Sequence, residues 1–247
     1  MMDANERKLG ALRFLSTLEK QLNARIPSPS VMRKSIHAIV DGAKNDPKLK
    51  HMRQPEDAFL YHYAVPVIFD HMRTQGIHDD EARQSLLSEY FQNMKQYCLD
   101  TPARTQGHPF SKVIGAKPAE IIARWKRTSG TRLTQSCPDF ALRDPFPFKI
   151  VFEGKYFANG GLVHAGHELV AQIYQAFFYR ALPYVAPKRK SSTKSSPAWD
   201  YEFACLLVYD ASKDGTMKAT WTALNAEVRK GFWDGANVYV MILRGKD

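Results

Sequence analysis

The chain has 247 residues, of which 44% are hydrophobic and 24% charged, as is usual for a soluble globular protein. It has no apolar run of the roughly 18 residues that a membrane span needs, and its N-terminus has no apolar signal-peptide core, so we expect a cytoplasmic protein without membrane contact. Cys98, Cys137 and Cys205 are widely spaced, which fits reduced thiols and excludes a CxxC zinc or redox motif.

The charge balance points to a polyanionic partner. Lysine and arginine number 35 against 25 acidic residues, which gives a formal net charge of +10. Such an excess favours nucleic acid or an anionic membrane as partner. No strongly basic amphipathic helix stands out, so we favour nucleic acid, although a basic composition alone is a weak indication.

The first part of the chain, residues 1–110, predicts a helical region. Five leucines from Leu9 to Leu22 recur at helical spacing and end before the breaker Pro27-Ser28-Pro29-Ser30. Further helices are expected at 31–44, 56–73 and 81–99. The aromatic and histidine-rich run 59–71 also recurs at helical spacing, which favours core packing over a ligand role.

After a loop rich in proline and glycine at 101–116, the pattern changes to strands alternating with helices. We expect a short turn between the first two strands and helices between the later ones, which indicates an α/β fold of the α+β type with a central mixed sheet flanked by helices. A second region is therefore expected at 111–247. Its elements are helix 117–127, strands 131–144 and 148–157, helix 167–182, strand 201–210, helix 216–232 and strand 236–244.

A basic, serine-rich segment at 186–198 predicts a mobile loop within the second region. Its positive charges are either a solvated spacer or a clamp for phosphate groups near the sheet, and we favour the clamp. The candidate DNA-binding residues of this loop are Lys188, Arg189, Lys190 and Lys194.

Two charged residues interrupt the apolar run 149–157. Glu153 and Lys155 are two positions apart, so in a strand they point to the same face. Setting both charges in an apolar strand costs desolvation unless the site uses them. If strand 131–144 pairs with this strand as a hairpin, one register brings Asp139 beside Glu153. A salt bridge at the end of a strand is the alternative interpretation.

These residue types predict a particular chemistry. Two adjacent carboxylates that remain ionised usually hold a cation, and oxygen ligands suit Mg²⁺. Lys155 on the same face can orient or deprotonate a water, or stabilise the charge that develops on a phosphate. Such a group on a basic protein indicates a site for phosphodiester hydrolysis.

The pattern Pro138-Asp139 and Glu153-Gly154-Lys155, on a hairpin that is followed by a helix and a strand, resembles the PD-(D/E)xK nuclease superfamily. It is most like a type II restriction endonuclease, and the likeness covers roughly residues 117–243. Gln175 and Tyr179 resemble the QxxxY element of the RecB-like and exonuclease branches. Glu120 occupies the place of an acidic residue that family members often add from the preceding helix.

The resemblance implies a restriction-endonuclease-like core at 111–247 and a site-specific, Mg²⁺-dependent DNA endonuclease, with Mn²⁺ as an alternative ion. Asp139 and Glu153 would bind the metal, Lys155 would position the attacking water, and Glu120 would assist. The partner would be double-stranded DNA, and cutting both strands of a palindrome calls for a homodimer. The helical region 1–110 would then supply the dimer surface or embrace the duplex.

Several alternatives remain open at this level. A repair, recombination or phage-defence nuclease has the same core, and a non-catalytic nucleic-acid-binding protein can keep this fold without activity. Packing of helix 167–182 on the sheet explains Tyr174, Phe177 and Phe178 without any function, and a DNA contact is the other role for Gln175. The helix dipole by itself favours a glutamate such as Glu120 near a helix start.

Overall fold

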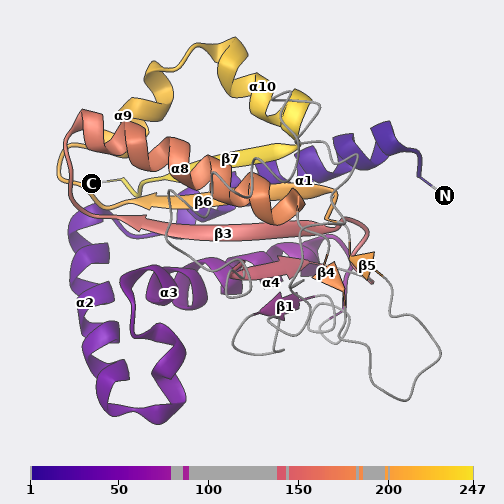
Figure 1. Cartoon of the computed structure of the whole chain (residues 1–247). Coiled ribbons are helices and arrows are strands. Elements are labelled where there is room, and N and C mark those ends of the chain that lie inside the picture. The colour runs from indigo at the N-terminus through magenta and orange to yellow at the C-terminus, as the bar shows by residue number, and fades with distance from the viewer. Residues whose placement is uncertain are drawn as a thin grey trace.

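The computed structural model describes residues 2–78, 86–88, 138–142, 145–181, 184–185, 198–199 and 201–246. Within these residues a five-stranded sheet has the strand order β1-β2-β3-β6-β7, and helices lie on both of its faces (Figure 1). The predicted α/β class with a central mixed sheet flanked by helices is therefore confirmed. No helix in these ranges combines the length and apolarity that crossing a bilayer requires.

The sheet is mixed because its strands are connected in two ways. Strands β1, β2 and β3 pair antiparallel, whereas β3, β6 and β7 pair parallel, with helices between them. All eight residues of β6, the strand between β3 and β7, are buried, as a strand covered on both faces requires. The bounds are β1 Leu86–Ser88, β2 Phe140–Leu142, β3 Ile150–Phe157, β6 Phe203–Asp210 and β7 Val238–Leu243, and a separate pair is formed by β4 Tyr184–Val185 and β5 Ala198–Trp199.

Helices of the N-terminal region cover one face of this sheet. In the first helix the predicted leucine stripe is buried at Leu15, Leu18 and Leu22, whereas Leu9 is exposed. Asp3 and Glu6 form a capping box at its start. The bounds are α1 Ala4–Arg25, α2 Pro29–Asn45, the 3₁₀ helix η1 Pro47–Met52, α3 Pro55–Phe59, the π-helix η2 Leu60–Ala64 and α4 Val65–Thr74.

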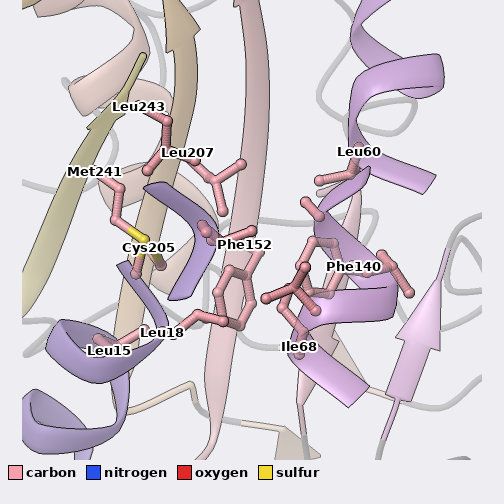
Figure 2. Close-up of a cluster of buried hydrophobic side chains, with 14 of the residues drawn as sticks. Leu15, Leu18, Leu60, Ile68, Phe140, Phe152, Cys205, Leu207, Met241 and Leu243 are labelled. Atoms are coloured by element: carbon pink, nitrogen blue, oxygen red, sulfur yellow. The ribbon is translucent and has the colours of Figure 1, made fainter. Parts of the chain in front are cut away.

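These helices and the sheet share one hydrophobic core, which Figure 2 shows. On one side Leu15 and Leu18 of α1 lie next to Cys205 of β6. On the other side Leu60 packs near the rings of Phe140 and Phe152, whose centroids are 4.4 Å apart. A stacked pair of this kind contributes about 0.5–1.5 kcal/mol beyond its buried area. The core packing predicted for the run 59–71 is thus confirmed, while the predicted boundary between residues 110 and 111 lies outside the described ranges.

The opposite face is covered by α8 (Leu162–Ala181), which is antiparallel to β3 and is followed later in the chain by α9 (Thr216–Ala223) and α10 (Ala226–Ala236). Helix α8 begins five residues before the predicted start at 167. The single helix predicted at 216–232 is wrong, because the chain breaks between α9 and α10, where the Asn225 side chain accepts a hydrogen bond from the Glu227 N–H.

Two further sequence predictions differ from the structure. Leu86–Ser88 lies in a predicted helix but forms strand β1, because pairing with β2 outweighs local helix propensity. In the predicted strand 131–144, the described part is a strand only at Phe140–Leu142. The predicted helix 117–127 and the greater part of the predicted loop 186–198 lie outside the described ranges.

Candidate active site

The charged residues of β3 lie on the sheet face that α8 covers. Residues alternate along a strand, and Phe152 belongs to the core under α1 and α4, whereas Val151 belongs to the core under α8. Glu153 and Lys155 share the parity of Val151. Both therefore point toward α8, as the spacing of two predicts.

The hairpin register brings Asp139 to Glu153. Phe140 pairs with Phe152, so the preceding Asp139 stands opposite Glu153 where β2 begins. Carboxylate oxygens of Asp139, Glu153 and Glu56 all lie within 4.8 Å of one another. The Oδ2 atom of Asp139 accepts a hydrogen bond of 2.6 Å from the backbone N–H of Gly154. Two of the predicted carboxylates are therefore adjacent, and a third joins them.

Lys155 is the cation of this group. Its Nζ atom lies 2.6 Å from Oε1 of Glu153 and 2.8 Å from Oε1 of Glu56, and its side chain is 15% exposed. Burial lowers the pKa of Lys155, but the neighbouring carboxylates Glu153, Glu56 and Asp139 outweigh it, so the net shift is upward. The ammonium is thus protonated at neutral pH. It can orient a water or stabilise negative charge, and the alternative role of deprotonating a water stays a prediction.

Glu56 is the residue that sequence reasoning missed. It lies in the first turn of α3, 99 positions before Lys155. Beyond Phe152, the antiparallel pairing of β3 with β2 ends, and α3 packs against β3 there. The sequence signal, acidic residues directly after Pro55, is the one that any helix start favours through its dipole. Nothing in that signal points to a distant strand.

The electrostatics of the group favour binding of a cation. Burial raises the pKa of Asp139 well above its ordinary value, and the charge of Glu153 raises it further. The charge of Lys155 acts in the opposite direction but is weaker. Three carboxylates face one ammonium, so the group carries excess negative charge when ionised. A divalent cation would relieve this repulsion, and an all-oxygen donor set fits Mg²⁺ or Mn²⁺. The residues present therefore fit the predicted metal.

The predicted QxxxY residues lie on the helix above this group. In α8, the side-chain amide of Gln175 donates to the Tyr179 hydroxyl at 3.2 Å. Burial raises the pKa of Tyr179, and the charge of Glu153 raises it further. Because the charge of Glu153 contributes, the Tyr179 phenol lies within electrostatic range of this carboxylate. Tyr179 also belongs to the core under α8. The packing predicted for this helix is confirmed for Phe177, which belongs to the same core, and is wrong for Tyr174, which is exposed.

The remaining predicted site residues lie outside the described part of the chain. They are Glu120, Lys188, Arg189, Lys190 and Lys194.

No protein-family model, curated protein or solved structure matches this chain. The inference of function therefore depends on the geometry of Glu56, Asp139, Glu153 and Lys155 and on the motif that three of these residues form. Chemically, the arrangement can hold a divalent cation and place an ammonium group beside it.

Proposed function

We propose that the protein is a Mg²⁺-dependent DNA endonuclease that hydrolyses phosphodiester bonds. The observation that carries the proposal is the convergence of Asp139, Glu153 and Glu56 within 4.8 Å, two of them paired with Lys155. Asp139 and Glu153 come from the β2–β3 hairpin, and Glu56 comes from helix α3, far away in the sequence. Burying charges in this way is expensive, and holding a metal ion at a phosphate is a use that offsets the cost.

Each side chain has a defined part in this reaction. The carboxylates of Asp139, Glu153 and Glu56 hold the cation, which supplies Lewis-acid activation when bound. The Asp139 carboxylate keeps its orientation through the Gly154 N–H. Lys155, protonated and next to the carboxylates, stabilises the negative charge that builds up on the phosphate oxygens and orients the attacking water. Tyr179 of α8 lies within electrostatic range of Glu153, and Gln175 donates a hydrogen bond to its hydroxyl.

The substrate class follows from the charge of the whole protein. With 35 basic and 25 acidic residues, the chain attracts a polyanion, which supports double-stranded DNA as partner. A site-specific type II restriction enzyme acting as a homodimer is the form that the motif favours. The resemblance of Gln175 and Tyr179 to the QxxxY element favours the alternative, a repair, recombination or phage-defence nuclease of the same fold.

A non-catalytic nucleic-acid-binding protein is the competing proposal from another class. Its support is the double ion pair of Lys155 with Glu153 and Glu56, which is also what a structural salt bridge between a strand and a helix looks like. Such a protein would hold DNA equally well in chelator and in Mg²⁺.

The test is cleavage of plasmid and phage DNA by the purified protein in Mg²⁺, with chelator and Lys155→Ala as controls. The matched variant is Lys230→Ala, which removes an exposed lysine that is also paired with a carboxylate, that of Asp234. Discrete fragments from the wild type and Lys230→Ala, absent in both controls, support a site-specific endonuclease. A smear favours the repair or recombination branch. Intact DNA with Mg²⁺ and with Mn²⁺ contradicts the proposal and favours the binding protein.

A further inference from the structure

The helix that carries Glu56 contains a π turn next to the site. Helices α3, η2 and α4 follow one another without a break from Pro55 to Thr74, and Leu60–Ala64 is the π-helical part. A π turn holds one residue more than an α turn and so rotates the helix that follows by about 100°. The residues before and within the turn can then face β3 while α4 packs against α1.

Tyr61, in this π turn, reaches the backbone of Asp139. Its hydroxyl donates a hydrogen bond of 3.0 Å to the Asp139 carbonyl oxygen, and the two residues are 7% and 8% exposed. Asp139 directly precedes the first residue of β2, so none of the described β2–β3 pairs includes it. The bond from Tyr61 therefore anchors the Asp139 backbone at the point where the strand begins.

The same helical segment also shapes the space around the Asp139 carboxylate. A Cβ atom at Gly154 would lie 3.0 Å from Cδ1 of Leu60 and 3.4 Å from Oδ2 of Asp139. The glycine thus lets the Leu60 side chain and the Asp139 carboxylate both lie close to β3. Asp139 is held by its backbone through Tyr61 and by its carboxylate through the Gly154 N–H.

This double hold matters because the Asp139 carboxylate would otherwise move away from its neighbours. Glu153 and Glu56 repel it, and a side chain whose backbone can shift relieves that repulsion by moving. A metal ion needs the opposite, namely ligands that stay together before it binds. Groups that orient metal ligands typically change metal affinity by 10- to 100-fold when they are removed.

We propose that Tyr61 is a positioning residue that sets the metal affinity of the site by fixing Asp139, an inference that rests on the proposed metal-dependent function. The hydroxyl of Tyr61 hydrogen-bonds to the backbone of Asp139, so Tyr61 supports a metal ligand rather than serving as one. It acts through the Asp139 carbonyl, and the helical segment Pro55–Ala64 thereby contributes both a ligand, Glu56, and the support of another ligand.

The test compares Tyr61→Phe with Tyr63→Phe. Tyr63 lies in the same π turn, and its hydroxyl pairs with the hydroxyl of Ser35 instead of a site residue. Both changes remove one hydroxyl and keep the ring, so both variants are expected to fold. Mn²⁺ binding is measured by titration calorimetry without DNA, with Asp139→Asn as the reference that identifies binding at this site. Unfolding temperature is measured in chelator.

The expected result is a dissociation constant for Mn²⁺ about 10- to 100-fold higher in Tyr61→Phe and unchanged in Tyr63→Phe. Unfolding temperatures in chelator should fall by similar amounts in the two variants. Equal affinity in wild type and Tyr61→Phe overturns the inference and leaves the metal site standing. If the wild type does not bind Mn²⁺, or Asp139→Asn binds it equally well, the proposed function fails and the inference fails with it.

Activity gives a second readout that separates positioning from folding. In Tyr61→Phe the Mg²⁺ concentration for half-maximal cleavage should rise, while the rate at saturating Mg²⁺ should approach that of the wild type. If Tyr61 served folding alone, the variant would lose the same fraction of activity at every Mg²⁺ concentration, and this result would contradict the inference.

Discussion

Buried carboxylates lie at two places in the sheet, on the neighbouring strands β3 and β6. The two sites differ in which groups contact the carboxylates. Asp210 ends β6 and is fully buried, yet its oxygens accept hydrogen bonds from the N–H and the hydroxyl of Ser212 and from the N–H of Lys218. In contrast, Asp139 and Glu153 face each other and Glu56. Burial alone is thus no sign of function, because the fold itself satisfies Asp210.

The contrast has a physical reason. Backbone N–H groups of Ser212 and Lys218 donate hydrogen bonds that hold the Asp210 carboxylate and fix the loop before α9, with Arg244 Nη1 4.0 Å away. Beside Lys155, burial raises the pKa of Asp139, and the charges of Glu153 and Glu56 raise it further. The first arrangement stabilises the fold, and the second stores electrostatic strain that a cation can relieve.

The largest expected effect is on catalysis. Glu153→Gln should reduce Mg²⁺-dependent cleavage by about a thousandfold, and Lys155→Ala by about a hundredfold or more, since each removes a charge from the reacting phosphate's surroundings. Asp210→Asn should keep the cleavage rate per folded molecule. Rates from single-turnover cleavage, normalised to the folded fraction, check this. Equal losses of cleavage rate in Glu153→Gln and Asp210→Asn would show that the two sites do not differ in function.

Glu56→Gln should have a smaller effect than Glu153→Gln, about 10- to 100-fold, because Glu56 is 34% exposed and water can replace it as a ligand. The same single-turnover assay measures it. A matched control is Glu227→Gln, an exposed glutamate in the first turn of α10. A Glu56→Gln variant with wild-type cleavage at every Mg²⁺ concentration would remove Glu56 from the site.

Metal should stabilise the protein through one of the two sites. At a Mn²⁺ concentration of 100 times the dissociation constant, the free energy of unfolding should rise by about 2.7 kcal/mol in the wild type and in Asp210→Asn. Glu153→Gln should show little or no gain. Urea unfolding with Mn²⁺ and with chelator measures the difference. A gain that survives in Glu153→Gln would mean that the ion binds elsewhere.

Without metal, the two aspartates should respond differently to substitution. Asp210→Asn should lower the free energy of unfolding by about 1–3 kcal/mol, because it weakens charge-assisted hydrogen bonds in a buried site. Asp139→Asn should leave it unchanged or raise it by about 0.5–2 kcal/mol, since it removes repulsion. Urea unfolding in chelator decides between them, and a loss in Asp139→Asn would show that its charge is satisfied as that of Asp210 is.

The smallest expected effect is on the pH dependence of stability, and it comes from His71. This residue is buried, and the fold favours its neutral form. Its Nε2 atom donates to the Phe14 carbonyl at 3.1 Å, and burial lowers the pKa of His71 despite this bond. Below about pH 6.5 the unfolded chain binds a proton that the folded protein resists, so stability should fall as the pH drops from 7 to 5. Thermal unfolding of His71→Gln should show a shallower pH slope, and an unchanged slope would contradict this origin.

Part of the site was predictable because it obeys local rules. The spacing of two sets Glu153 and Lys155 on one face, and a hairpin register brings Asp139 opposite Glu153. Likewise, Gln175 and Tyr179 are four apart on one helix and so lie together. Each of these relations follows from the period of a strand or a helix.

The rest depends on contacts that no local rule fixes. Tyr61 bonds to Asp139 across 78 positions, and Glu56 reaches Lys155 across 99. In the sequence, both residues belong to a segment that predicts only a helix at 56–73 and no functional role. The break before α10 does have a local signal, because Asn225 is a residue type that caps helix starts, but the prediction of one helix at 216–232 does not use it.

The central claim is that the carboxylates of Asp139, Glu153 and Glu56 bind one divalent cation. The most direct measurement is a crystal structure with Mn²⁺, in which anomalous scattering locates the ion. We expect a peak among these three carboxylates, with Lys155 displaced from at least one of its two ion pairs. A map without a peak there, in which Lys155 still pairs with both Glu153 and Glu56, would contradict the claim and leave a structural salt bridge in its place.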